Sequence, residues 1–243
     1  MSAVFPCFLI NLDTSVDRLA YVSQQAEAAK LTFERFNAVR GKGMARSVNG
    51  DVFAEHLTDG EVGCYMSHLS CMRLMLERGW PYALILEDDI SIEAGIVPLL
   101  CEAVASAPLG WDYIHLSSVV KNRTYPVVTL PSGGRTLVAY SRLPVNTAGY
   151  IISAAGAEKF LRPDKRLCPI DMEIRYGWRR NFNIYGMLPA PVRQRPEFDS
   201  DIGHRSRKQS LSRLRHRWEP SVWSRLYGVI WQTVKLSAAR RIR

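Results

Sequence analysis

The chain has 243 residues, of which 47% are hydrophobic and 23% are charged, as is typical of a globular protein with one large core. No stretch approaches the roughly 18 apolar residues that a membrane span needs, and residues 1–8 lack the basic start and long apolar core of a signal peptide. The five cysteines are odd in number and form no CxxC pair, which argues against a disulfide framework and a zinc cluster. We therefore expect a cytoplasmic protein.

The positive charge is concentrated at the C-terminal end. The whole chain carries +9, whereas residues 202–243 hold eleven Lys and Arg against one acid, Glu219, and carry +10. The other 201 residues therefore sum to about −1. A nearly neutral main domain argues against nucleic acid as a partner, and the basic tail points to a local anionic partner.

The first third of the chain predicts a β-α-β beginning. Short apolar runs alternate with stretches of helical periodicity, which is typical of a doubly wound sheet. Thr58 and Glu61 have the spacing of a capping box at the start of the second helix. The predicted elements are strand 8–13, helix 15–30, strand 33–39, a polar connector 51–59, helix 61–78 and strand 83–86.

The remaining elements continue this alternation. Pro and Gly residues interrupt residues 122–142 and favour a hairpin-like or irregular insertion. We predict an α/β domain over residues 1–203, with a mostly parallel central sheet flanked by helices, and a helical tail over residues 204–243. The other predicted elements are helix 96–105, strand 111–116, strand 147–153, helix 154–161, a helix opened by 169–171, strand 182–188 and an extended segment 189–201.

Three carboxylates, Glu87-Asp88-Asp89, follow the apolar strand 83–86 directly. Open α/β sheets bind ligands at the carboxyl ends of their strands. A hard divalent metal that itself holds a diphosphate is a natural occupant for such a cluster. A solvated acidic turn explains the same residues, so the triplet alone leaves both readings open. The chain contains no GxGxxG, GxxxxGK[ST] or GxSxG motif, so neither a dinucleotide fold nor a P-loop nor a hydrolase elbow is supported.

A series of motifs in chain order resembles glycosyltransferase family 25, which contains bacterial lipooligosaccharide β-galactosyltransferases and the related collagen galactosyltransferases. The resemblance covers roughly residues 5–203 and excludes the tail. The motifs are 8–13 (FLINLD), 36–41 (FNAVRG), 61–68 (EVGCYMSH), 84–89 (LILEDD), 149–157 (GYIISAAGA), 169–171 (PID) and 191–194 (PVRQ).

This resemblance implies a GT-A fold, a Rossmann-like nucleotide-sugar domain, with a UDP-sugar donor and Mn²⁺ or Mg²⁺ as cofactor. Glu87-Asp88-Asp89 stands where the family has its Asp-x-Asp motif. Asp89 is then the metal ligand, Glu87 helps to place the metal or the ribose, and Asp88 contributes to donor binding with the least certain role. The metal stabilises the UDP leaving group.

The resemblance also implies transfer of galactose from UDP-galactose to a lipooligosaccharide or lipopolysaccharide acceptor. A β linkage made from an α-linked donor inverts the anomeric centre and needs a carboxylate base. Asp171 is the first candidate and Glu173 the second. Asp171 is equally well explained as an N-cap or an acidic residue in the first turn of its helix.

Further residues are candidates for donor and metal contacts. Asn11 and Arg18 follow the first strand and are expected to meet the nucleotide, although Arg18 also fits a solvated helix position. Ser67 and His68 are assigned to the donor site; for His68, a buried histidine satisfied within the fold is an equal alternative. His204, or Asp201, is expected to complete the metal shell, and a surface position is the competing explanation for His204.

The tail has the pattern of an interfacial amphipathic helix. Trp223, Tyr227, Ile230, Trp231 and Val234 recur at helical spacing among basic residues. We expect it to bind an anionic membrane at the inner face of the bacterial inner membrane, near a lipid-linked glycan acceptor. A helix docked on the same domain is the alternative. Two functional alternatives also remain: another UDP-sugar, such as glucose or N-acetylgalactosamine, and a non-catalytic membrane-bound assembly factor.

Overall fold

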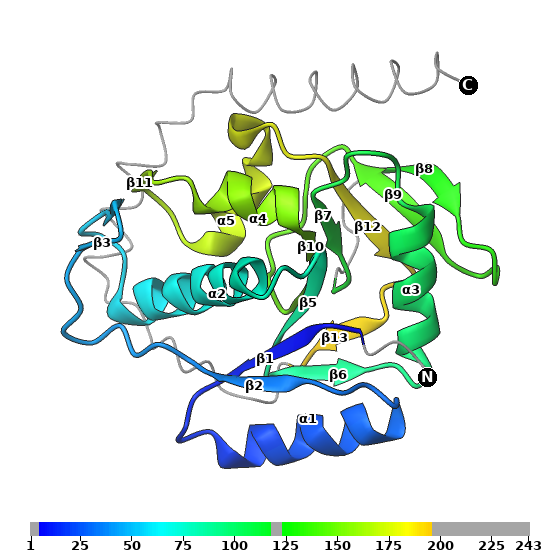
Figure 1. Ribbon diagram of the computed structural model, residues 1–243, viewed down its shortest axis with the longest axis horizontal. Helices are drawn as coiled ribbons and strands as arrows, with labels where there is room; N and C mark the ends of the chain where they lie inside the picture. The colour runs from blue at the N-terminus through cyan, green and yellow to red at the C-terminus, as the bar shows by residue number, and fades with distance from the viewer. Residues whose placement is uncertain (1–4, 118–122, 196–243) are drawn as a thin grey trace.

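The computed structural model describes residues 5–117 and 123–195. A mixed eight-stranded sheet forms the centre of the molecule, with the strand order β2-β1-β5-β10-β7-β12-β9-β8. Helices cover both faces of this sheet (Figure 1). The predicted tail, the domain boundary at residue 203 and the candidates Asp201 and His204 lie outside the described residues.

The N-terminal half confirms the predicted β-α-β beginning. Its elements are β1 (Cys7–Asn11), α1 (Val16–Ala28), β2 (Glu34–Asn37), α2 (Asp59–Glu77) and β5 (Tyr82–Glu87). β1 pairs in parallel with both β2 and β5. The predicted capping box is confirmed, because Thr58 Oγ1 accepts from the Glu61 N–H at 3.2 Å and Glu61 Oε2 accepts from the Thr58 N–H at 2.9 Å.

The prediction of a mostly parallel sheet is wrong. β10 (Gly149–Ser153) runs antiparallel to both of its neighbours, β5 and β7 (Tyr113–His115). β12 (Ile184–Leu188) is parallel to β7, whereas the hairpin of β8 (Thr124–Thr129) and β9 (Thr136–Tyr140) adds two antiparallel pairings. A strand buried on both faces reads as the same apolar run in either direction, so the sequence of β10 does not reveal its orientation.

Two smaller sheets flank the central one. β3 (Ser47–Val48), β4 (Asp51–Phe53) and β11 (Lys165–Arg166) form one of them, so part of the predicted polar connector 51–59 is a strand. β6 (Ile90–Ile92) pairs with β13 (Val192–Gln194) in antiparallel fashion. This second pairing brings the end of the described chain beside the acidic triplet, since Gln194 lies opposite Ile90.

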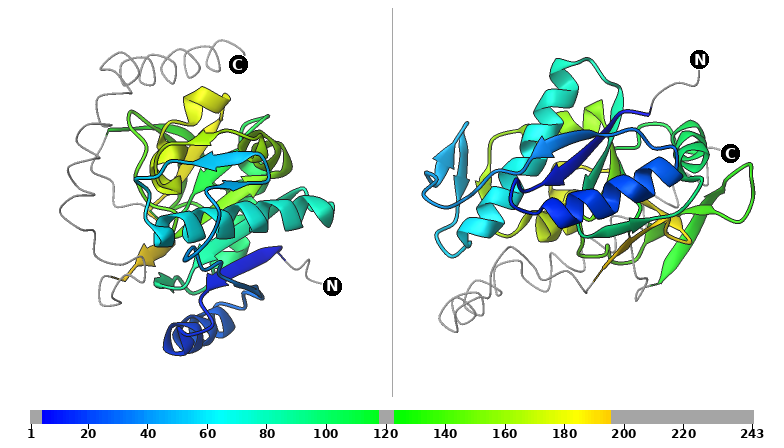
Figure 2. Two further views of the ribbon diagram at one scale, coloured as in Figure 1. Left: turned by 90° about the vertical axis from the view of Figure 1, so that its left-hand side faces the viewer. Right: turned by 90° about the horizontal axis from the view of Figure 1, so that it is seen from below.

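Two separate clusters of apolar side chains pack against the two faces of the central sheet. Along β5, Ala83 and Ile85 face one cluster while Leu84 and Leu86 face the other, as the two-residue period of a strand requires. The first cluster contains residues of α2, α4 (Ala154–Leu161) and α5 (Ile170–Arg175); the second contains residues of α1 and α3 (Ile96–Ser106). Figures 1 and 2 show α1 and α2 on opposite sides of β1.

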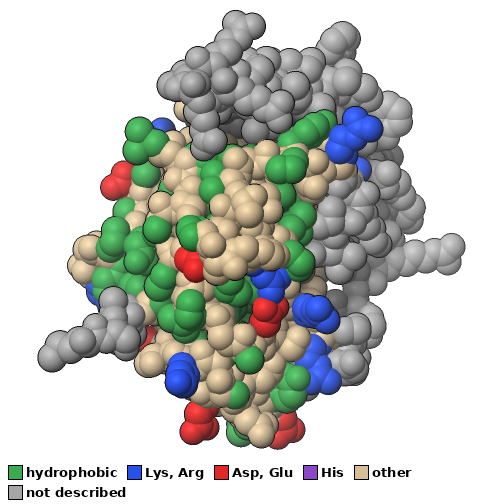
Figure 3. All heavy atoms as spheres, turned by 90° about the vertical axis from the view of Figure 1, so that its right-hand side faces the viewer, with side chains coloured by type: hydrophobic (Ala, Val, Ile, Leu, Met, Phe, Trp, Pro, Cys, Tyr) green, Lys and Arg blue, Asp and Glu red, His purple; other side chains and the backbone are tan. Residues whose placement is uncertain are grey.

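The surface on the side of α3 and the β8–β9 hairpin carries scattered hydrophobic side chains between polar and backbone atoms (Figure 3). Scattered exposure of this kind is ordinary for a globular surface. Within residues 5–117 and 123–195, no helix combines the length and the apolarity that crossing a bilayer takes.

Candidate functional site

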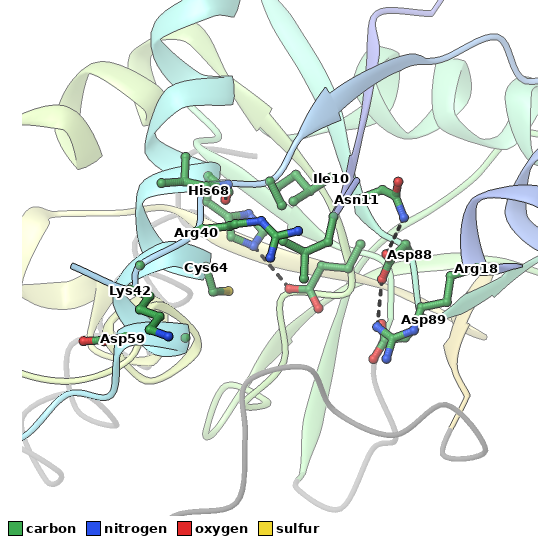
Figure 4. Close-up of a pocket in the computed structure, with 17 residues that line it drawn as sticks. Ile10, Asn11, Arg18, Arg40, Lys42, Asp59, Cys64, His68, Asp88 and Asp89 are labelled. Carbon is green, nitrogen blue, oxygen red and sulfur yellow. Dashed lines mark hydrogen bonds and ion pairs between the residues drawn. The ribbon is translucent and has the colours of Figure 1, made fainter. Parts of the chain in front are cut away.

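A cavity of about 350 Å³ opens at the carboxyl ends of β1 and β5 (Figure 4). Its walls come from β1, α1, the loop after β2, α2 and the end of β5. Seven of the predicted site residues line it, and these are Asn11, Arg18, Ser67, His68, Glu87, Asp88 and Asp89. The parallel arrangement of β1 and β5 produces this convergence, because their carboxyl ends meet at one edge of the sheet.

Asp88 is bound by the protein itself. Its carboxylate accepts from Asn11 Nδ2 at 2.7 Å and from Arg18 Nη1 at 3.2 Å, and the residue is buried. Arg18 is therefore held in an ion pair rather than solvated on the helix surface. Asp88 thus holds the end of β1 against α1. This structural role explains the acidic residue in the middle of the triplet, and no bound ligand is needed to explain it.

The side-chain amide of Asn11 is saturated by protein groups. Its Nδ2 donates to Asp88 and to the Ser15 carbonyl at 3.0 Å, and its Oδ1 accepts from Arg35 Nε at 2.9 Å. Asn11 is buried. It therefore shapes the cavity wall by holding β1, α1 and β2 together.

Ser67 serves the same kind of role on α2. Its hydroxyl donates to the Gly63 carbonyl and accepts from the Val39 N–H, each at 2.8 Å. A side chain at Gly63 is excluded, because its Cβ would lie 2.4 Å from the Val39 carbonyl oxygen. Ser67 and Gly63 thus fix the loop after β2 directly on α2.

The loop after β2 brings two basic residues to the cavity, and neither was predicted from the sequence as a site residue. Arg40 and Lys42 both line it (Figure 4). Arg40 also pairs with Asp13 at the surface. In the sequence, these two residues belong to a basic turn, Arg40-Gly41-Lys42-Gly43, which follows a predicted strand and could have indicated an anion site. Only the fold shows that this turn faces the carboxylates.

Glu87 is ionised within a network of hydrogen bonds. Burial acts to raise the pKa of Glu87, but hydrogen bonds from His68 and Thr147 outweigh it and hold the pKa below its ordinary value. The Nε2 of His68 lies 3.2 Å and Thr147 Oγ1 lies 2.5 Å from Oε1 of Glu87. Nδ1 of His68 lies 2.9 Å from the hydroxyl of Tyr150. In the neutral tautomer protonated at Nε2, His68 donates to Glu87 and accepts from Tyr150.

Asp89 has the free coordinating capacity that Asp88 lacks. Its Oδ2 accepts from Gln194 Nε2 at 2.8 Å, whereas its buried Oδ1 has no hydrogen-bond partner among residues 5–117 and 123–195. Burial, followed by the negative charge of Glu87, raises the pKa of Asp89 to about 6. A divalent cation relieves both costs, so the carboxylates of Asp89 and Glu87 fit a Mn²⁺ or Mg²⁺ ion.

A second cavity, of about 170 Å³, adjoins the first and shares Cys64 and Glu87 with it. Its other lining residues include Asn146, Thr147, Asp171 and Gln194. Asp171 lies in the first turn of α5, where Oδ1 accepts from the Met172 N–H at 2.7 Å. The N-cap position of this helix is Pro169, so Asp171 is a first-turn acid and not the capping residue.

The structure places Glu173, the second candidate base, in a buried group of ion pairs. Its carboxylate is 9% exposed and accepts from Arg166 Nη1 at 2.9 Å and from Arg180 Nη2 at 2.7 Å. Arg166 is itself fully buried and also binds Asp51. Two guanidinium partners keep Glu173 in the core, and it lines neither of the two cavities. It is a structural ion-pair residue.

These features define an α/β protein with a carboxylate-lined cleft of two joined cavities at the ends of parallel strands. The family model described as glycosyltransferase family 25 (LPS biosynthesis protein) matches residues 5–174. The protein belongs to glycosyltransferase family 25, since this match covers more than half of the chain.

Individual relatives share part of their length with this chain. Procollagen galactosyltransferase 1 of Danio rerio is 29% identical over 182 residues, which cover 68% of this chain and 30% of the relative. Inactive glycosyltransferase 25 family member 3 of Homo sapiens is 34% identical over 120 residues, which cover 47% of this chain and 20% of the relative. The chain thus spans less than a third of these relatives.

Among solved structures, a 4-diphosphocytidyl-2C-methyl-D-erythritol synthase from Anaerococcus prevotii aligns over 86% of this chain and 95% of its own. Its TM-score is 0.32 at 9% sequence identity, which is too low to indicate a common fold.

Proposed function

We propose that the protein is a metal-dependent, inverting galactosyltransferase that moves galactose from UDP-galactose to a saccharide acceptor with a β linkage. The observation that supports this most is the pair of carboxylates at the end of β5. Asp89 lines the larger cavity with a buried oxygen that has no hydrogen-bond partner among the described residues, and Glu87 borders both cavities. A GT-A-like nucleotide-sugar domain is part of this proposal.

The larger cavity is the proposed donor site. Its volume of about 350 Å³ falls within the range of small-molecule sites. Arg40 and Lys42 supply positive charge on the wall that faces the carboxylates, which suits a diphosphate. Mn²⁺ or Mg²⁺, held by Asp89 and Glu87, would neutralise charge that develops on the UDP leaving group. Asn11, Ser67 and Asp88 keep the wall rigid rather than touching the donor.

The smaller cavity is the proposed acceptor site, and Asp171 is the proposed base. Asp171 lines this cavity beside Asn146 and Gln194, whose polar side chains can orient sugar hydroxyls. The shared wall at Glu87 supports this arrangement, because an acceptor in the smaller cavity would lie next to the donor's sugar. Asp171 would take the proton of the attacking hydroxyl, which makes that oxygen a better nucleophile.

Donor and acceptor identity rest on the comparisons. The similarity to the zebrafish procollagen galactosyltransferase supports galactose, and the family's description as an LPS biosynthesis protein supports a bacterial lipopolysaccharide or lipooligosaccharide acceptor. UDP-glucose and UDP-N-acetylgalactosamine remain the alternative donors, because few contacts distinguish epimers. We further propose that the basic tail 204–243 attaches a cytoplasmic enzyme to the anionic inner face of the inner membrane.

A non-catalytic role is the second candidate function, and one observation favours it. The human relative at 34% identity is named an inactive member of the family. A chain of this kind would retain the fold and the glycan contacts without transfer.

The two candidates are separated by a donor screen with matched variants. UDP-galactose, UDP-glucose and UDP-N-acetylgalactosamine are incubated with a lipooligosaccharide acceptor and Mn²⁺, Mg²⁺ or EDTA. We expect transfer from UDP-galactose with metal only. Asp171→Asn should lower the rate at least about 100-fold, as the loss of a general base does. Asp89→Asn should also lower the rate strongly, because the metal that stabilises the leaving group loses a ligand. Only Asp89→Asn should also weaken binding of Mn²⁺–UDP in calorimetry.

Asp17→Asn serves as the control, because Asp17 is an exposed acid of α1 outside both cavities. Unchanged transfer by a folded Asp89→Asn protein refutes the metal role. No nucleotide binding and no transfer with any donor favours the non-catalytic alternative.

A further inference from the structure

A second group of potential metal ligands lies in the wall that the two cavities share. Cys64 and His68 stand four residues apart on α2, so their side chains share one face of that helix (Figure 4). Glu87 approaches them from the end of β5. One ligand atom from each residue lies within 4.8 Å of the others. This group shares Glu87, but not Asp89, with the site proposed above for Mn²⁺ or Mg²⁺.

We propose that Cys64, His68 and Glu87 form a separate site for Zn²⁺, and that Zn²⁺ bound there blocks the junction of the two cavities. The site combines one sulfur, one nitrogen and one oxygen ligand. Such a donor set suits Zn²⁺, whereas Mn²⁺ and Mg²⁺ prefer oxygen ligands alone. Three protein ligands leave the fourth tetrahedral position to water, as in open zinc sites.

The spacing of two ligands already matches a tetrahedral ion. Bonds of about 2.0–2.1 Å from zinc to nitrogen and oxygen place those atoms about 3.3 Å apart at the tetrahedral angle. His68 Nε2 and Glu87 Oε1 are 3.2 Å apart. A zinc–sulfur bond of about 2.3 Å requires Sγ at about 3.6 Å from the nitrogen. Since the ligand atoms lie within 4.8 Å, Cys64 needs to move by little more than an ångström.

The surroundings of His68 prepare it for a metal. Its Nδ1 lies 2.9 Å from the Tyr150 hydroxyl, and Tyr150 is fully buried and stacked on Tyr113 with ring centroids 4.6 Å apart. A partner on the second ring nitrogen orients a histidine ligand and fixes its tautomer. On zinc binding, the ring proton of His68 moves from Nε2 to Nδ1, and the Nδ1–H then donates a hydrogen bond to the Tyr150 oxygen. Cys64 releases its thiol proton to solvent, so one proton is lost for each ion bound.

Inhibition follows from the shared ligand and rests on the proposed function. Glu87 cannot serve Zn²⁺ and the proposed donor metal in the same way at once. A zinc ion at the junction also occupies space between donor and acceptor. Binding itself is independent of transfer and is measured without either substrate.

The test is a titration of the metal-free full-length protein with Co²⁺ and then Zn²⁺. Co²⁺ replaces Zn²⁺ and gives an ultraviolet charge-transfer band only when a thiolate is a ligand. We expect wild type to bind one Co²⁺ ion and to show this band. The band should disappear when added Zn²⁺ displaces Co²⁺. Cys64→Ser should abolish the band and weaken Zn²⁺ binding more than about 100-fold, beyond the usual effect of losing an outer partner. The Asp89→Asn variant should retain both the thiolate band with Co²⁺ and the wild-type affinity for Zn²⁺.

Two further cysteines provide matched controls. Cys101 is exposed and Cys168 half-buried, and neither lines the two cavities. Cys101→Ser and Cys168→Ser should keep the thiolate band and the Zn²⁺ affinity. If the enzyme transfers sugar, micromolar Zn²⁺ should inhibit wild type, and each variant is compared with its own zinc-free rate.

The inference is overturned if wild type gives no thiolate band with Co²⁺, whatever the fate of the variants. It is equally overturned if folded Cys64→Ser binds Zn²⁺ as tightly as wild type. A wild type that binds Zn²⁺ at this site but shows no transfer under any condition refutes the proposed function and leaves the zinc site standing.

Discussion

Gln194 connects the proposed metal ligand with the proposed acceptor cavity. Its Nε2 donates to Asp89 Oδ2 at 2.8 Å, and its Oε1 lies 3.4 Å from Asn146 Nδ2. The pairing of β13 with β6 places Gln194 opposite Ile90, next to the acidic triplet. The carboxylate of Asp89 therefore depends on one side chain for its orientation.

Replacing Gln194 by Leu keeps most of the side chain's volume and removes this hydrogen bond. A hydrogen bond to a charged group contributes about 1.5–3 kcal/mol, which corresponds to about 10- to 150-fold in affinity for Mn²⁺–UDP. The bond also acts to lower the pKa of Asp89, which burial raises to about 6. Without the bond this pKa rises further, so the protonated fraction grows near neutrality. The loss of affinity should be greater at pH 6 than at pH 8.

The assay is calorimetric titration of Mn²⁺–UDP into wild type and Gln194→Leu at both pH values. Gln24→Leu is the control, because Gln24 is an exposed residue of α1 that lines neither cavity. Circular dichroism verifies that each variant is folded. An affinity of folded Gln194→Leu within about twofold of wild type at pH 6 refutes the role assigned to the hydrogen bond.

Three further predictions concern stability. Arg166→Met should lower the free energy of unfolding by about 3–5 kcal/mol, because it removes a fully buried cation from Asp51 and Glu173; urea denaturation measures this, and a loss below 1 kcal/mol contradicts it. Burial lowers the pKa of His115 to about 4, so wild type should lose about 2–3 kcal/mol as pH falls from 7 to 4.5. His115→Asn should lack that part of the loss, and equal slopes for the two proteins disprove its origin in His115. Thr58→Ala should cost about 1 kcal/mol through the capping box, and an unchanged melting temperature argues against it.

Burial lowers the pKa of His115 because it disfavours the charged imidazolium, and this effect outweighs the hydrogen bond to Asn146, which acts to raise the pKa. The Nε2 of His115 lies 2.9 Å from the Asn146 carbonyl oxygen, and its Nδ1 accepts from the Ser117 N–H at 3.2 Å. Both ring nitrogens are satisfied in the neutral form, so the folded state disfavours protonation. In the unfolded chain the ordinary pKa of about 6.5 applies. Stability is therefore complete above pH 6.5 and declines as pH falls towards 4.

Local pattern alone determined much of the N-terminal half. The alternation of buried strand and amphipathic helix places β1, α1, β2, α2 and β5, and the spacing of Thr58 and Glu61 predicts the capping box. The same logic places the acidic triplet at a strand end. These features depend on neighbours within a few residues, so their signals are present in short stretches of sequence.

Tertiary structure decided which carboxylates are held in ion pairs with basic side chains. Asp88 and Glu173 resemble Asp89 and Asp171 in sequence, yet Asp88 is bound by Arg18 and Asn11, and Glu173 is held by two arginines. The partners of Asp88 are 70 and 77 positions away along the chain. A local pattern carries no information about such partners, because they are set by packing.

Strand direction and the shared wall of the cavities were likewise decided by the fold. The apolar run of β10 fits a parallel or an antiparallel neighbour equally well, and only its place between β5 and β7 settles the direction. Gln194 reaches Asp89, and Glu87 reaches Cys64 and His68, because β13, β5 and α2 meet at one edge of the sheet. The sequence by itself determined which residue types are present for this chemistry, whereas their grouping into two joined cavities depends on contacts between distant segments.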